Sequence, residues 1–230
     1  MKKILLFIIG VLFILTPKIV FADGINDYYI NATILDNGDL EVEEYFDLDS
    51  RYNGMERIIK YRNSNSVEFN AYDTSYGGSS IHNGNNMMIE EIKSVSINHD
   101  FNFNNFDGKL FKKVEYASIG DYGVYTENII DGGLSTKIFM PSSKKKAFYI
   151  KYILNNMAVL HDDVGELGWS IFDTALNESI KNLRVYVSVP NNKDIIKVWA
   201  HGPENGKSNI ISNEKVEATI NNLNSNTAID

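Results

Sequence analysis

Hydrophobic and polar residues alternate with a period of two along much of the chain. The alternation runs through residues 28–34 and resumes through residues 40–48, after Asp36-Asn37-Gly38-Asp39. Successive side chains of a β-strand point to opposite faces of the sheet, so each run predicts a strand with one buried face. Asn-Gly readily adopts the two positive φ angles of a type I′ turn. The pattern therefore predicts a β-hairpin that turns at Asn37 and Gly38.

Many further short runs are rich in β-branched and aromatic residues and are separated by Asn-Gly, Asp-Gly or Pro. They predict strands at residues 67–72, 88–98, 110–117, 136–140, 147–154, 168–172, 183–189, 195–200, 209–212 and 215–220. No long segment has the i, i+3, i+4, i+7 spacing of an amphipathic helix. The sequence therefore predicts an all-β fold, a two-layer β-sandwich of mainly antiparallel strands that is immunoglobulin-like or jelly-roll-like.

The segment around the first Trp predicts part of the core. In the run 183–189, four aliphatic residues share one face, while Arg, Tyr and Ser share the other. The Trp lies about a strand's length upstream and can bury against the aliphatic face. We interpret it as a core residue, because Trp is usually highly buried; the alternative is a ligand-binding platform. The residues predicted to form this core are Trp169, Leu183, Val185, Val187 and Val189.

The first 22 residues have the pattern of a secretory signal peptide. Lys2 and Lys3 give a positive start, residues 4–15 are apolar, and Val20-Phe21-Ala22 supplies a cleavage site. A bilayer span takes about 20 apolar residues. The apolar run of 12 residues therefore favours a cleaved signal over an uncleaved anchor. No linker or repeat divides the remainder, so we expect residues 23–230 to form one exported, extracytoplasmic domain.

The acidic composition narrows the range of partners. The net charge is −8, and without the signal peptide it becomes −11, because 19 basic residues then remain against 30 acidic ones. Nucleic acids and anionic lipid surfaces attract basic proteins, so we expect no nucleic-acid partner and no broad electrostatic docking on lipid. The chain has no Cys. A chain of about 200 residues buries enough surface to fold without disulfides.

Several short motifs follow one another in a distinctive order. They are Gly38 to Glu44, Gly54 to Ile59, Tyr149-Ile150-Lys151-Tyr152, Glu166-Leu167-Gly168-Trp169, the run from Ile180 to Pro190, and Gly202 to Gly206. From about Tyr28 to Asp230, this order resembles the N-terminal domain of the YciQ-like predicted membrane proteins, a bacterial family without an established function. The resemblance implies an exported β-rich domain followed by membrane-spanning segments. It thus implies a truncated chain whose membrane anchor lies beyond Asp230.

The densest set of potential metal ligands is His161, Asp162, Asp163 and Glu166. Clustered oxygen donors on a loop can hold Ca²⁺ outside the cell. The alternative is a solvated acidic loop, which we favour because the EF-hand spacing of ligands is absent. We therefore expect no cofactor.

Sequence motifs for catalysis are sparse. Residues 142–145 match S-x-x-K, but the S-D-N and K-T-G elements that accompany it in β-lactamases are absent. The sequence contains no G-x-S-x-G, and its four His do not have the H-E-x-x-H spacing. Arg57, one of four Arg residues, is predicted to form a structural salt bridge with Glu43 or Glu44.

The sequence favours a non-enzymatic, extracytoplasmic domain of a membrane-anchored protein, acting in recognition, assembly or envelope structure with an envelope protein or glycan as partner. The alternative is a secreted carbohydrate- or wall-binding module, in which exposed aromatic residues such as Tyr72, Tyr76 or those at 101–106 stack on sugars. A metal-dependent hydrolase that uses Asp162 is the third hypothesis.

Overall fold

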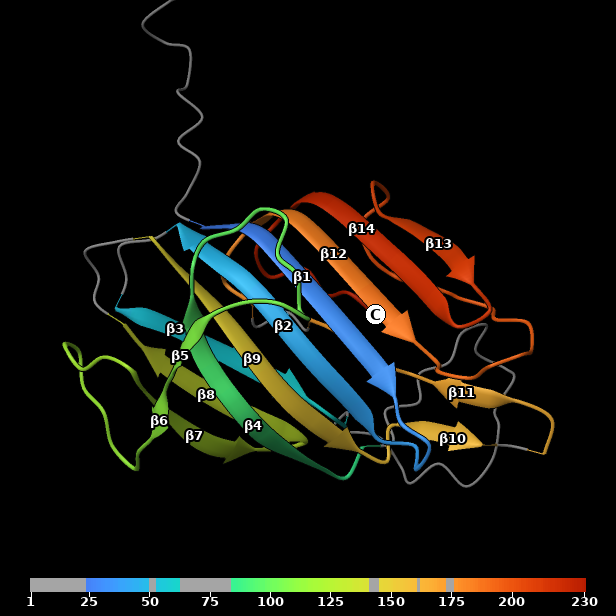
Figure 1. The fold of residues 1–230 in the computed structure, drawn as a ribbon, viewed down its shortest axis with the longest axis horizontal. Coiled ribbons are helices and arrows are strands. Elements are labelled where there is room, and N and C mark those ends of the chain that lie inside the picture. The colour runs from blue at the N-terminus through green and yellow to red at the C-terminus, as the bar shows by residue number, and fades with distance from the viewer. Residues whose placement is uncertain (1–23, 50–52, 63–83, 141–144, 161, 173–175) are drawn as a thin grey trace, which may run out of the picture.

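The computed structural model describes residues 24–49, 53–62, 84–140, 145–160, 162–172 and 176–230, and the predicted signal peptide lies outside these residues. All the regular secondary structure of the described residues is β-strand (Figure 1). Their bounds are β1 Gly24–Ile34, β2 Leu40–Asp49, β3 Gly54–Lys60, β4 Asn86–Val95, β5 Gly108–Leu110, β6 Lys112–Lys113, β7 Val124–Ile130, β8 Gly133–Phe139, β9 Lys146–Asn155, β10 Ala158–Leu160, β11 Gly165–Leu167, β12 Ile180–Ser188, β13 Lys207–Ser212 and β14 Lys215–Leu223.

Two sheets form the layers of the molecule. The larger sheet has eight strands in the order β13-β14-β12-β1-β2-β9-β4-β5, and the smaller has four in the order β3-β8-β7-β6. In Figure 1 the large sheet lies in front and β3 and β8 cross behind it. Most neighbouring strands are antiparallel, although β1 pairs with β12 and β6 with β7 in parallel. The predicted all-β sandwich of mainly antiparallel strands is confirmed.

The hydrophobic core lies between the two sheets. Alternate residues of β1 and β2, such as Tyr28, Ile30, Val42 and Phe46, point into it and are fully buried. The period-two pattern of the sequence is thus the pattern of burial. Met55 and residues of β8 cover this face from the small sheet and belong to the same cluster.

The β1–β2 hairpin forms as predicted, but its turn differs. Gly38 N donates a hydrogen bond to Leu35 O at 2.9 Å, and Leu35 N donates one to Asp39 O at 2.8 Å. Gly38 has φ 84°, whereas Asn37 is not among the residues with positive φ. The loop therefore has three residues with one left-handed glycine, and the predicted type I′ turn is wrong. The side chain of Asn37 instead accepts a hydrogen bond from Asp39 N at 3.1 Å.

The Trp169 segment lies against the core without forming the predicted strand. Trp169 is 8% exposed and belongs to the core cluster. The one strand-like contact within residues 168–172 is a bridge between Phe172 and Ile229. On β12, Leu183 and Val185 are buried, Val187 is partly buried against the core, and Val189 lies beyond the end of the strand and outside the cluster.

Several strand predictions need correction. Residues 195–200 form no strand, and the run 110–117 is broken after Lys113. The strands β3, β7, β10 and β11 were not predicted, because their short runs lack a long regular alternation. The prediction at 67–72 lies outside the described residues.

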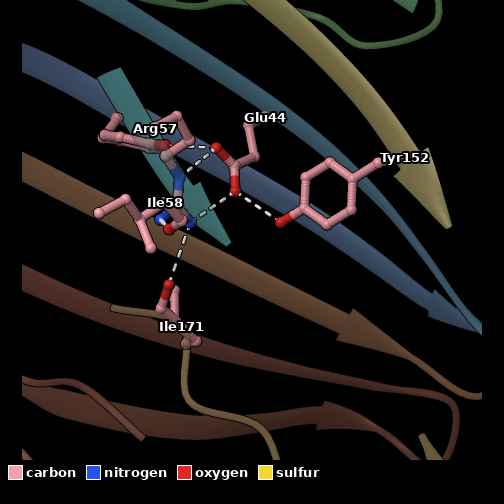
Figure 2. Close-up of polar contacts among 6 residues, drawn as sticks. Glu44, Arg57, Ile58, Tyr152 and Ile171 are labelled. Carbon is pink, nitrogen blue, oxygen red and sulfur yellow. Dashed lines mark hydrogen bonds and ion pairs between the residues drawn. The ribbon is translucent and has the colours of Figure 1, made fainter. Parts of the chain in front are cut away.

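A buried ion pair joins the two sheets. Arg57 of β3 donates from Nε and Nη2 to the two carboxylate oxygens of Glu44 on β2, at 3.0 and 2.8 Å. Tyr152 on β9 donates its hydroxyl to Glu44 at 2.6 Å, and Tyr28 on β1 donates to the other oxygen. Arg57 also donates to Ile171 O at 3.0 Å (Figure 2). The predicted salt bridge is confirmed with Glu44.

This arrangement keeps both partners charged. Burial alone would raise the pKa of Glu44. The charge of the Arg57 guanidinium and the hydrogen bonds that the carboxylate accepts hold that pKa below its usual value. Burial and the neighbouring Glu44 carboxylate raise the pKa of Tyr28 and of Tyr152 well above 10, so both stay protonated donors. The guanidinium also lies 4.9 Å from the centroid of the Phe172 ring. The ion pair thus connects both sheets to the segment after Trp169.

Trp169→Ala is expected to lower the free energy of unfolding by about 3–5 kcal/mol, because it empties a large core site. Trp199→Ala is the matched control, since Trp199 is 69% exposed. Urea denaturation followed by circular dichroism measures both. Equal stability of the Trp169 variant and the wild type would show that this side chain is not part of the core.

Arg57→Met is expected to cost about 3–5 kcal/mol at neutral pH, because it leaves the buried Glu44 carboxylate without its partner. Since the folded pKa of Glu44 is lowered, the stabilisation exists above the unfolded pKa of about 4.3 and is lost as the pH falls through the folded value. The difference between wild type and variant should therefore shrink in acid.

Arg184→Met is the control for this experiment, because Arg184 is exposed and lies 3.8 Å from Glu217. Denaturant titrations at a series of pH values compare the three proteins. A cost for Arg57→Met that equals the cost for Arg184→Met would contradict the role of the ion pair.

Candidate functional site

The acidic loop that the sequence singled out lies on a small hairpin. Strands β10 and β11 pair, so the loop between them contains Asp162 and Asp163, both exposed. Glu166 lies within β11 opposite Val159 and is partly buried. Within the described residues these three carboxylates do not gather into a group that could hold a metal ion, and His161 lies outside those residues.

A different set of side chains converges in the structure: Asp27, Asp47 and His99. Their potential ligand atoms all lie within 4.8 Å of one another. Asp27 and Asp47 are buried, whereas His99 is exposed. Asp27 accepts hydrogen bonds from His99 Nδ1 and, at 2.9 Å, from Asn182 Nδ2. Its own backbone N–H donates to Asp47 Oδ1 at 2.7 Å.

The environment of this cluster favours protonation of two of its members. Burial raises the pKa of Asp47, and the neighbouring Asp27 carboxylate adds to the effect. The hydrogen bond and the charge of Asp27 raise the pKa of His99. The cluster therefore combines a buried carboxylate pair with one titratable exposed base.

His99 belongs to the connection between β4 and β5, which crosses the outer face of the large sheet (Figure 1). Its aromatic residues pack on tyrosines of the sheet: the Phe101 and Tyr45 rings stack at 4.1 Å between centroids, and those of Phe106 and Tyr149 lie 4.5 Å apart. Tyr29 donates its hydroxyl to His99 O, and Tyr45 accepts one hydrogen bond from Asn98 N at 2.8 Å. These rings are used for packing, which leaves Phe101 and Phe106 poorly placed to stack on sugars.

A surface hollow lies in the connection between β6 and β7. It has a volume of about 330 Å³ and is lined by Val114, Tyr116, Gly120, Asp121, Tyr122 and Val124. In Figure 1 this connection, coloured lime, projects beyond the small sheet at the left. The hollow thus lies on a projecting loop and not between the sheets.

The side chains around the hollow are unusually exposed for their types. Tyr116 is 89% exposed and Tyr122 is 67% exposed, and Ile119 between them is also exposed. The backbone of the loop is held by Asp121, whose Oδ2 accepts a hydrogen bond from Ser118 N at 2.8 Å. Gathered exposed aromatic and aliphatic side chains mark surfaces that meet a partner.

Sequence reasoning missed both places for identifiable reasons. The run predicted as one strand extended to residue 117 and included Tyr116, whereas Tyr122 was in no predicted strand. Asp27, Asp47 and His99 are far apart in the sequence and meet only through strand pairing and a loop. Tyr72 and Tyr76, also suggested as sugar-stacking residues, lie outside the described residues.

Comparison with known proteins identifies a family that the chain matches. Residues 24–230 match the model of the family described as "Predicted membrane protein (DUF2207) N-terminal domain". The match bears out the family resemblance of the motif order. A comparison with curated proteins found no significant match to the chain.

One solved structure that the comparison found is that of a "putative protease" from Parabacteroides distasonis ATCC 8503. It has 11% sequence identity and a TM-score of 0.41, and the alignment covers 89% of this chain. This chain spans 39% of the length of that protein. Across the described part of the chain, no helix has the length and apolar character needed to span a membrane.

Proposed function

The chain belongs to the DUF2207 family as an N-terminal domain of a predicted membrane protein, and from this premise we propose that it is a non-enzymatic recognition domain on the extracytoplasmic face of the membrane. The hollow between β6 and β7 is its contact surface. The N-terminal pattern of two Lys followed by an apolar run supports the extracytoplasmic side.

The observation that carries the proposal is the exposure of Tyr116 and Tyr122, which both line the hollow. Tyr supplies a large apolar ring and a hydroxyl with few rotatable bonds, and it is enriched where proteins bind partners. Rings that were part of the core would be covered, as Tyr28 and Tyr152 are. The exposed pair therefore gives the domain a prepared contact area.

The lining of the hollow favours binding over catalysis. Its titratable side chains are two tyrosines and Asp121, and the carboxylate of Asp121 is engaged in holding the turn at Ser118. General acid–base catalysis needs a group placed to exchange protons with a substrate. The geometry supplies rings and hydrogen-bonding groups, which suit recognition.

The second candidate function is carbohydrate binding in the envelope. Two exposed rings beside a carboxylate offer apolar faces for a sugar ring and an acceptor for its hydroxyls. The acidic surface, with 30 acidic and 22 basic residues in the chain, is more compatible with a neutral glycan than with an anionic polymer. This candidate uses the same hollow, so one pair of variants tests both.

The double variant Tyr116→Ala/Tyr122→Ala is expected to bind isolated cell envelopes at least about tenfold more weakly than the wild type, because loss of a hot-spot pair costs more than about 1.4 kcal/mol. Co-sedimentation of the purified protein with envelopes from its own cells measures the binding. Removing envelope proteins with protease beforehand separates the candidates: retained binding favours a glycan, and lost binding favours a protein.

Trp199→Ala is the matched control, because it removes an exposed aromatic ring that does not line the hollow. It should bind like the wild type. Undiminished binding by the double Tyr variant would remove the hollow from the proposal.

We expect protease added to intact cells to digest this domain while cytoplasmic proteins remain whole, because the proposal places the domain outside the membrane. Immunoblotting with an antibody against residues 23–230 measures the result. Cells opened by lysis serve as the control. Digestion in the lysate alone would place the domain on the cytoplasmic side.

A further inference from the structure

Three separate parts of the fold bring Asp27, Asp47 and His99 together. Asp27 lies near the start of β1 and Asp47 near the end of β2, where the pairing register shifts between Ile25 and Tyr28. At this irregularity the backbone N–H of Asp27 donates to the Asp47 side chain at 2.7 Å. A β-bulge commonly re-aims a side chain in this way. The β4–β5 connection then places His99 over both carboxylates.

A nearby positive charge would stabilise the two buried carboxylates. Asp27 is 3% exposed and Asp47 is 2% exposed. Carboxylates that share a buried position repel each other, and a buried charge is costly unless it has a partner. One ion pair of the cluster joins Asp27 to His99, and the imidazole carries a charge only when it is protonated. A divalent cation would compensate both carboxylates at once.

The spacing of the donors suits a single ion. All three ligand atoms lie within 4.8 Å of one another. Donors around a tetrahedral ion with bonds of about 2.0–2.2 Å are about 3.3–3.6 Å apart, so the hydrogen-bonded atoms of His99 and Asp27 move apart while the wider pairs close. His99 is exposed, which leaves its ring room to make that closure.

Outer hydrogen bonds already orient the carboxylates. Asn182 Nδ2 donates to Asp27 Oδ1 at 2.9 Å, and the Asp27 backbone N–H donates to Asp47 Oδ1. Metal ligands in proteins are usually held by such second contacts, whose loss costs about 10–100-fold in affinity. The positions of Asp27 and Asp47 are thus set before an ion arrives.

A pocket adjoins the cluster and supplies space for water ligands. It has a volume of about 80 Å³ and is lined by Asn26, Asp47, Leu48, Ile97, His99 and Lys145. Three protein ligands and room for water are the arrangement of an open metal site. Because the exposed His99 forms one side of the pocket, an ion can enter from solvent.

We propose that Asp27, Asp47 and His99 bind one divalent transition-metal ion of the Zn²⁺ class. One imidazole nitrogen with two carboxylates suits Zn²⁺ and its neighbours, whereas Ca²⁺ and Mg²⁺ take oxygen donors. The ion fastens the β4–β5 connection to β1 and β2 and uses none of the residues that line the hollow. This site is separate from the recognition surface and does not depend on it.

Isothermal titration calorimetry of the chelator-treated protein with ZnCl₂ tests the site. We expect one ion per chain, with an affinity lowered at least tenfold in each of Asp27→Asn, Asp47→Asn and His99→Ala. Asn182→Ala should lower it by about tenfold, as loss of an outer contact does. Circular dichroism of every variant confirms folding, so weaker binding by a folded variant is informative.

His201→Ala and Lys145→Gln are the matched controls. His201 is exposed and lies outside the cluster, so its loss should leave the affinity unchanged. Lys145 lines the pocket as a cation, so removing its charge should leave the affinity equal or higher. A visible absorption spectrum of the Co²⁺-loaded protein that depends on His99 provides a second, direct readout.

Two results would overturn the proposal. One is the absence of heat and of a Co²⁺ spectrum at a tenfold excess of metal. The other is binding that survives His99→Ala but disappears in His201→Ala. Either would leave the contact between His99 and Asp27 as a salt bridge that fastens the loop.

Discussion

The buried ion pair between Glu44 and Arg57 is the interaction on which the arrangement of the sheets depends. It is the polar contact in which the large sheet, the small sheet and the segment after Trp169 all take part. A buried charge without its partner is costly, so each sheet requires the other at this point. The hydrophobic contacts around it are non-directional and would allow the sheets to slide, whereas a guanidinium with two bonds to one carboxylate fixes their relative position. At this point the position of β3 relative to β2 is therefore held by one pair of residues.

On the outer face of the large sheet, the β4–β5 connection buries a second group of side chains. The β4–β5 connection places Phe101 and Phe106 on the tyrosines of β2 and β9, which turns the outward side of Tyr45 and Tyr149 into a small second core. Covering the sheet in this way also covers Asp47, which would otherwise face water. The carboxylate pair is buried because an aromatic loop lies across it. The same packing that stabilises the loop thus creates the site with unusual electrostatics.

The sequence predicted the fold where one face of a strand is buried along its whole length. The β1–β2 hairpin and β12 have a regular alternation, β9 begins with a run that is buried on both faces, and each forms a strand. The prediction failed where tertiary context decides: residues 195–200 have strand-like composition but form no strand, and β3 forms by pairing with β8 along its whole length. That ion pair was predictable because Arg is rare in the chain and carboxylates are concentrated at residues 43–44. The Asp27–Asp47–His99 cluster was not, because 72 positions separate Asp27 from His99 and no spacing rule connects them.

Both candidate sites lie on one stretch of chain, since residues 96–124 carry His99 near one end and the hollow near the other. Phe111 separates them. It is buried, its ring meets Phe148 edge-on at 6.1 Å between centroids, and its backbone N–H donates to Ile92 O at 2.8 Å. At this residue the chain passes from the large sheet at β5 to the small sheet at β6. A buried residue of this kind anchors the backbone between the two loops. The stretch therefore consists of two loops, one that carries His99 to the carboxylate pair and one that carries the exposed Tyr116 and Tyr122.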